Sequence, residues 1–182
     1  MATYVALLYS IGLGEGRRLV MADFRAMAEK LGLEAPRTLI ATGNLVFEAS
    51  GTTVRQLEAR LESAFEKTFG RRVDIIVRNA AAWRKLIAGN PFAAESRVDG
   101  SRVVARVARR PIGSSVVSAL EHYQAKGERV KVVNGDLWIH FADEPNQSSI
   151  FGALTPGRLN GAGTLRNWNT IRRLGDMLAP DQ

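Results

Sequence analysis

The order of elements predicted for residues 1–78 constrains the fold more than any other feature of the sequence. Apolar or alternating stretches predict strands, and amphipathic stretches predict helices. The predicted strands are 4–9, 38–42, 45–48 and 73–77, and the predicted helices are 23–31 and 54–69. The resulting order, strand, helix, strand, strand, helix, strand, is the split βαβ arrangement of ferredoxin-like folds. Residues 1–78 are therefore predicted to form one ferredoxin-like half of an α+β protein.

Turn and capping signals support these elements. Gly43-Asn44 and Asn134-Gly135 each separate two predicted strands, and we expect both pairs to form tight turns with positive φ. Thr53-x-x-Gln56 has the pattern of a capping box at a helix start. Gly70 is expected to end the same helix.

Residues 79–182 are predicted to repeat this order of strands and helices and to form a second α+β half with a C-terminal helix. Strands are expected at 102–108, 129–133 and 137–141, with helices near 115–123 and 148–154. The last amphipathic helix is expected to begin at Asn167 or Asn169. The predicted architecture is therefore two ferredoxin-like halves, 1–78 and 79–182, in one compact unit.

The composition limits the classes of function. The chain has 182 residues and no Cys, which excludes disulfides and thiolate chemistry. No basic region precedes an apolar stretch at the N-terminus, and the longest apolar run, 4–9, is far too short to span a membrane. We therefore expect a cytoplasmic protein without a membrane partner. The sequence leaves the oligomeric state open.

The net charge of +7 favours acidic ligands or polyanions. The excess is spread along the sequence, with no basic tail. Arg102, Arg106 and Arg110 form a stripe on a predicted strand, which suggests nucleic-acid binding. RNA-binding sheets of this topology also carry strand aromatics, and none occurs between Val98 and Val117. The stripe is therefore interpreted as a solvated face, or as arginines paired with neighbouring carboxylates.

No catalytic set is recognised, so the sequence leaves open whether the protein is an enzyme. The two histidines, His122 and His140, are isolated, and we predict neither a metal nor a cofactor. Gly-x-Ser-x-Gly does not occur. The glycines at 12, 14 and 16 follow the first strand, where such a loop can cradle phosphate, although the spacing departs from G-x-G-x-x-G.

The segment 164–170 combines one Arg, two Asn, two Thr and one Trp in seven residues. We expect its asparagines to cap a helix and Trp168 to be buried as an anchor. Arg166 is expected to pair with an internal carboxylate or carbonyl, or else to face an anion pocket.

Several stretches together resemble the bacterial family catalogued as domain of unknown function 1697. They are Ala6-Leu7-Leu8, Met21-Ala22-Asp23-Phe24, Thr42-Gly43-Asn44-Leu45-Val46-Phe47, Asn90-Pro91-Phe92 and the segment 164–170. The resemblance implies an α+β fold of ferredoxin-like character and no established activity. The chain departs from the family at several positions: Tyr9 stands where the family has Arg, Gly12 where it has Asn, Ala41-Thr42 where it has Gln-Ser, and Ser149 where it has Lys. If the family site binds an anion through that Arg and Lys, this chain has lost two charges from it.

These observations predict one polar site, formed where the glycine loop, the Gly43-Asn44 hairpin and the segment 166–170 converge. The predicted ligand-binding residues are Gly12, Gly14, Asn44, Ser148, Arg166, Asn167, Asn169 and Thr170. The leading hypothesis is a binding module for a small anionic or polar ligand. The alternatives are a nucleic-acid-binding protein with a basic surface, and an enzyme without a recognisable catalytic set.

Overall fold

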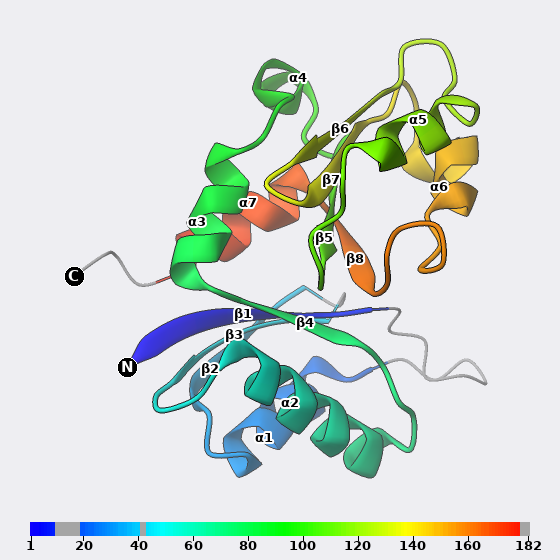
Figure 1. Cartoon of the computed structure of the whole chain (residues 1–182). Helices are drawn as coiled ribbons and strands as arrows, with labels where there is room; N and C mark the ends of the chain where they lie inside the picture. The colour runs from blue at the N-terminus through cyan, green and yellow to red at the C-terminus, as the bar shows by residue number, and fades with distance from the viewer. Residues whose placement is uncertain (10–18, 41–42, 179–182) are drawn as a thin grey trace. The chain divides into compact units, whose positions relative to one another are not determined.

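The computed structural model describes residues 1–9, 19–40 and 43–178, and it confirms the α+β class (Figure 1). The chain divides into two compact units. Unit 1 comprises Met1–Arg84 and Leu174–Gln182, and unit 2 comprises Lys85–Arg173. Each unit contains one four-stranded antiparallel sheet. None of the described helices is both long enough and apolar enough to cross a membrane.

Unit 1 has the element order predicted for the first half of the chain. Its elements are β1 (Ala2–Leu8), α1 (Met21–Lys30), β2 (Glu34–Leu39), β3 (Asn44–Ala49), α2 (Val54–Phe69) and β4 (Ile75–Asn79). The strands lie in the order β2-β3-β1-β4, and neighbouring strands are antiparallel. This is the strand order of a split βαβ sheet.

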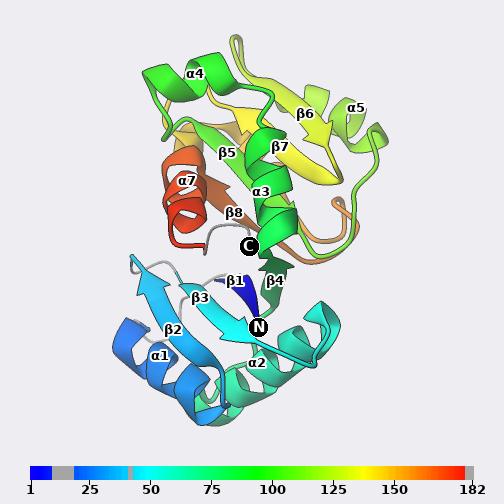
Figure 2. The ribbon, with the colours of Figure 1, turned by 90° about the vertical axis from the view of Figure 1, so that its left-hand side faces the viewer.

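Helices α1 and α2 cover one face of this sheet (Figures 1 and 2). Aromatic side chains fill the space between the layers. Tyr4 of β1 stacks on Phe47 of β3, with ring centroids 5.6 Å apart. Phe24 of α1 meets Phe65 of α2 edge-on at 6.0 Å. Burial of these rings fixes both helices against the sheet.

Local signals in the sequence set the ends of α2. The Thr53 side chain accepts a hydrogen bond from the Gln56 amide, and the Gln56 side chain accepts one from the Thr53 amide, at 3.3 and 2.9 Å. The helix ends at Gly70, whose φ of 71° is in the left-handed region. The predicted capping box and glycine stop are therefore confirmed.

The prediction of a two-residue turn at Gly43-Asn44 is wrong in register. Gly43 has the expected positive φ of 69°, but Asn44 is already the first residue of β3 and pairs with Leu39. The connection therefore runs from Ile40 to Gly43, and its residues 41 and 42 lie outside the described residues. The buried Asn44 side-chain amide donates to the Leu39 carbonyl at 3.0 Å. Asn44 therefore stabilises the pairing of β2 with β3 and does not form the turn.

Unit 2 has a second sheet of the same topology. Its strands are β5 (Val103–Ala108), β6 (Arg129–Val133), β7 (Asp136–His140) and β8 (Gly163–Asn167), in the order β6-β7-β5-β8. Its helices are α4 (Ala93–Val98), α5 (Ser115–Glu121), the 3-10 turn η1 (Pro145–Gln147) and α6 (Ser149–Ala153). Helices α3 (Ala80–Ala88) and α7 (Trp168–Asp176) each cross the boundary between the units. The structural repeat expected from the sequence is thus present in the strand order.

The strand β8 was not predicted. Its sequence opens with Gly163 and contains no run of β-branched or aromatic residues, so the local signal for a strand is weak. Pairing with β5, from Val104↔Asn167 to Ala108↔Gly163, holds the segment in the sheet. Tertiary pairing here overrides local propensity.

The core of unit 2 lies on one face of its sheet. Leu137 and Ile139 of β7 pack there with Leu120 of α5 and Ile150 of α6. Because side chains alternate along a strand, the intervening Trp138 and the following His140 face the other side.

The Asn134-Gly135 turn joins β6 and β7 as predicted. Val133 pairs with Asp136, and the two turn residues have φ values of 53° and 84°. Two positive φ values are the mark of a type I′ turn, whose twist suits an antiparallel hairpin.

Gly135→Ala should destabilise the protein by about 1–3 kcal/mol, because a β-carbon is strained at positive φ. That carbon would also lie 2.7 Å from Cβ and 2.9 Å from Cα of Pro111. Urea unfolding measures the change. Gly157→Ala is the matched control, since its added carbon meets nothing within 4 Å and its φ is not positive. Equal stability of the two variants would contradict the role given to this turn.

Candidate functional site

The residues predicted to form a site are distributed over both units. Asn44 belongs to unit 1, whereas Ser148 and the residues from Arg166 to Thr170 belong to unit 2. Gly12 and Gly14 lie outside the described residues. Ser148 caps α6, where its hydroxyl accepts from the Ile150 amide at 3.1 Å.

The segment 166–170 joins β8 to α7, and its polar groups serve this junction. The Asn167 side chain accepts from the Thr170 amide at 3.0 Å, so Asn167 caps the last helix as predicted. The Trp168 amide donates to the Gly100 carbonyl at 3.1 Å. Asn169 is exposed and Thr170 is buried. These contacts give the segment a role in the fold.

Arg166 is buried, and its Nη1 donates to the Thr164 hydroxyl and the Leu165 carbonyl, each at 2.8 Å. An internal carbonyl was one of the partners expected from the sequence. Burial lowers the pKa of the guanidinium to about 10, so Arg166 is charged near neutral pH.

Two expectations about large side chains need correction. Trp168 is only half-buried, with its ring 6.2 Å from that of Trp138, so it is not a fully buried anchor. Arg106 is not part of a solvated face: it is buried and donates to the Gly161 carbonyl at 2.6 Å. Arg102 does pair with a carboxylate, Asp99, at 3.3 Å. The alternation of β5 was misjudged because all six of its residues are buried.

A different group of side chains gathers on the face of the unit 2 sheet that lies opposite its core. The β6–β7 register pairs Arg129 with His140 and Lys131 with Trp138. Residues paired across an antiparallel ladder project to the same face. This face therefore carries an arginine, a lysine and a histidine on adjacent strands.

Phe92 lies beneath these cations. Its ring is fully buried, and the His140 ring lies 5.9 Å away. Cζ of Arg129 and Nζ of Lys131 are 5.1 and 5.6 Å from the ring centroid. Cation–π attraction therefore holds both positive groups over one aromatic ring.

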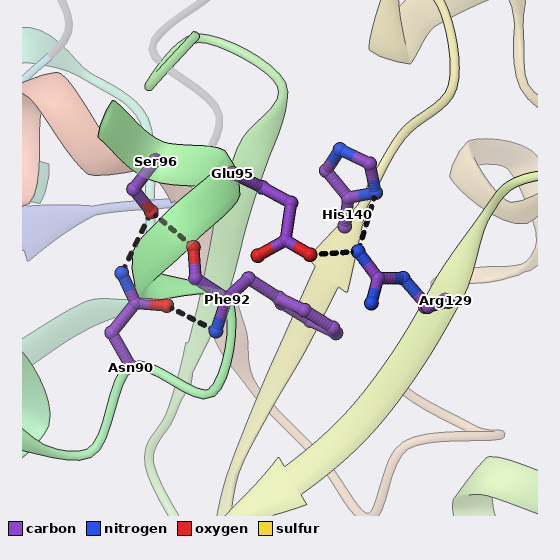
Figure 3. Close-up of polar contacts among 6 residues, drawn as sticks. All are labelled: Asn90, Phe92, Glu95, Ser96, Arg129 and His140. Atoms are coloured by element: carbon purple, nitrogen blue, oxygen red, sulfur yellow. Dashed lines mark hydrogen bonds and ion pairs between the residues drawn. The ribbon is translucent and has the colours of Figure 1, made fainter. Parts of the chain in front are cut away.

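A short hydrogen-bond network fixes Phe92 (Figure 3). The Asn90 side chain accepts from the Phe92 amide at 2.9 Å and donates to the Ser96 hydroxyl at 2.8 Å. The Ser96 hydroxyl in turn donates to the Phe92 carbonyl at 2.8 Å. These hydrogen bonds within the loop before α4 hold Phe92 and Glu95 in a defined orientation.

Glu95 of α4 completes the group, since its carboxylate accepts from Nη2 of Arg129 (Figure 3). The same Nη2 lies 3.5 Å from Nδ1 of His140. The hydrogen bond from Arg129 holds the pKa of the Glu95 carboxyl below its ordinary value of 4.5. The Arg129 side chain is 50% exposed and that of Glu95 28% exposed, so ligands have access to the guanidinium.

We call this group the Phe92 cluster; it consists of Asn90, Phe92, Glu95, Ser96, Arg129, Lys131 and His140. Its chemistry suits binding of an anion by a cationic, partly exposed surface. Among the described residues, no three His, Asp or Glu side chains are grouped to hold a metal ion.

Sequence reasoning missed the cluster, although two signals were present. Asn90-Pro91-Phe92 was interpreted only as part of the family resemblance. The Asn134-Gly135 turn also sets the register, which places residue 129 opposite 140 and residue 131 opposite 138. Treating His140 as an isolated residue overlooked the neighbours across the hairpin.

Comparison with known proteins gives a family and a fold. Residues 1–138 match the family described as Protein of unknown function (DUF1697), and the chain therefore belongs to this family. The chain is also similar to "conserved bacterial protein SP0830 from Streptococcus pneumoniae", a solved structure, with 23% identity and a TM-score of 0.75. That likeness covers 98% of this chain and 99% of the other, and it concerns the fold alone. No curated protein matches the chain.

The Glu95–Arg129 pair should make stability depend on pH. Folding lowers the pKa of Glu95, so the pair stabilises the protein above pH 4.5 and this contribution is lost as the pH falls through the lowered value. Glu95→Gln should therefore be less stable than the wild type at pH 7, and this difference should shrink as the pH falls below 4.5. Urea unfolding at pH 7 and at a series of lower pH values tests this. Glu144→Gln, at an exposed glutamate, is the control and should match the wild type at every pH. A Glu95→Gln variant that also matches the wild type at every pH would refute the stabilising role of the Glu95–Arg129 pair.

Asn90→Ala should lower the free energy of unfolding by about 1–3 kcal/mol, because the buried Phe92 amide loses its acceptor. Asn146→Ala, at an exposed asparagine of η1, is the matched control. Chemical denaturation compares the two. Should Asn90→Ala be as stable as its control, the network does not hold the loop.

Proposed function

We propose that this member of the DUF1697 family is a binding module for a small anionic ligand, bound at the Phe92 cluster. The observation that carries the proposal is the placement of Arg129 and Lys131 over one buried ring, 5.1 and 5.6 Å from its centroid. A guanidinium and an ammonium on neighbouring same-face positions suit a carboxylate or phosphate group. The proposal includes the cytoplasmic location expected from the sequence.

The charge of unit 2 supports this proposal. Residues 85–173 contain 13 Lys and Arg but only seven Asp and Glu, so unit 2 carries a net charge of +6 out of the +7 of the chain. A division of the sequence into equal halves conceals this bias, because Lys85 belongs to unit 2 while Asp176 and Asp181 belong to unit 1. A positive unit raises the local concentration of anions and their rate of association.

Preorganisation is the second support. Phe92 is held by the network of Asn90 and Ser96, and Arg129 and Lys131 are anchored on a strand of the sheet. A site that is ordered before binding loses less conformational entropy when the ligand arrives. The capping contacts of Ser148 and Asn167, by contrast, already use their side-chain oxygens within the fold.

Nucleic-acid binding is the second candidate, favoured by the +6 charge of unit 2. Base stacking on the sheets does not support it, however. The Phe, Tyr and Trp residues of the described strands are Tyr4, Phe47 and Trp138, with exposed fractions of 8%, 0% and 0%. Sheets that bind RNA present such rings to the bases. The binding of a small anion is therefore the better-supported function.

Isothermal titration calorimetry with inorganic phosphate tests the proposal. Arg129→Gln and Lys131→Gln should each weaken binding by about tenfold, since each removes a charged hydrogen-bond donor. Arg110→Gln and Lys126→Gln make the same charge changes at exposed positions outside the cluster and should bind as the wild type does. The affinity should fall only gradually with salt.

Two results would contradict the proposal. Equal weakening in all four variants would mean that phosphate responds to diffuse charge and not to this cluster. Tight binding of a single-stranded oligonucleotide, with a steep fall of affinity with salt, would instead support the nucleic-acid candidate.

A further inference from the structure

We propose that Glu95 is an internal competitor for the anion site and restricts it to ligands with a doubly charged group, the class of phosphate monoesters. This inference rests on the proposed function and concerns the selectivity of the same site. It starts from the fact that the guanidinium of Arg129 already contacts a carboxylate of this chain.

The structure holds that carboxylate in place. Glu95 lies in the first turn of α4. The start of this helix is fixed because the Ser96 amide and the Ser96 hydroxyl both donate hydrogen bonds to the Phe92 carbonyl, at 2.9 and 2.8 Å. The Asp99 amide donates to the Glu95 carbonyl at 2.9 Å at the helix end. Because the backbone of Glu95 is anchored on both sides, its carboxylate is presented to Arg129 at a high local concentration.

The balance of charge decides which ligands can compete. Arg129, Lys131 and Glu95 together carry a net charge of +1. A ligand with one carboxylate that displaces Glu95 forms the same kind of ion pair that it breaks, and it leaves Glu95 unpaired nearby. A doubly charged group attracts Arg129 and Lys131 together, and its oxygens can accept from both.

The ionisation of the neighbouring groups agrees with this role. The hydrogen bond from Arg129 lowers the pKa of Glu95, so the competitor is charged at neutral pH. The charged or titratable groups placed on the cluster are Arg129 and Lys131 of β6, His140 of β7 and Glu95 itself. Nδ1 of His140 lies 3.5 Å from Nη2 of Arg129, on the same face of the sheet.

A matched pair of ligands tests the inference. Phenyl phosphate and benzoate share an aromatic ring and differ in the charge of the acidic group. At pH 7.5 the wild type should bind phenyl phosphate more tightly than benzoate. Glu95→Gln, which keeps the shape of the side chain, should bind benzoate roughly fivefold more tightly, the upper range for release of an exposed ion pair. Glu121→Gln, at an exposed glutamate of α5, should leave both affinities unchanged.

Inorganic phosphate, measured in parallel, distinguishes a free ion from an ester as the ligand. Phenyl phosphate bound more tightly than benzoate supports the proposal, and the affinity of inorganic phosphate shows whether the ester group adds to binding. Equal affinities for benzoate and phenyl phosphate in the wild type, or an unchanged benzoate affinity in Glu95→Gln, would overturn it while leaving anion binding intact. Failure of all three ligands to bind to both proteins would instead refute the proposed function.

Discussion

The register of the β6–β7 hairpin determines which side chains share the face opposite the core of unit 2. The type I′ turn at Asn134-Gly135 pairs Arg129 with His140 and Lys131 with Trp138. A slip of one residue would turn every side chain of one strand to the other face. Arg129 and Lys131 would then point into the apolar core, and neither could lie over Phe92. The proposed anion site therefore depends on a two-residue turn that lies outside the Phe92 cluster.

Much of the fold was predictable, because it is encoded in local signals. The capping box at Thr53, the left-handed Gly70 and the Asn134-Gly135 turn each act within a few residues, and the structure contains all three. The strand β8 was missed because its sequence lacks strand propensity and its place is set by pairing with β5. The Phe92 cluster was missed for a related reason, since it combines a loop, a helix and two strands that only tertiary structure brings together.

Arg166 and Arg129 are two cations in different surroundings. Arg166 donates to a hydroxyl and a carbonyl inside the fold, and burial lowers its pKa. Arg129 is half exposed, lies over an aromatic ring and is paired with a carboxylate that the solvent can reach. The first arrangement stabilises a junction between strand and helix, whereas the second leaves a charge that an incoming anion can contact. The density of polar residues near 166–170 thus identified a structural junction, and the ligand site is proposed elsewhere.

The central claim, that anions bind at the Phe92 cluster, is tested most directly by locating the bound ion in solution. Inorganic phosphate can be titrated into isotope-labelled protein while the arginine Nε–Hε signals are followed by NMR. The account predicts that the Arg129 signal shifts and saturates with a single midpoint. The signals of Arg110 and Arg158, two exposed arginines outside the cluster, should stay in place. A stationary Arg129 signal at concentrations that shift other arginines, or equal shifts at all exposed arginines, would contradict it.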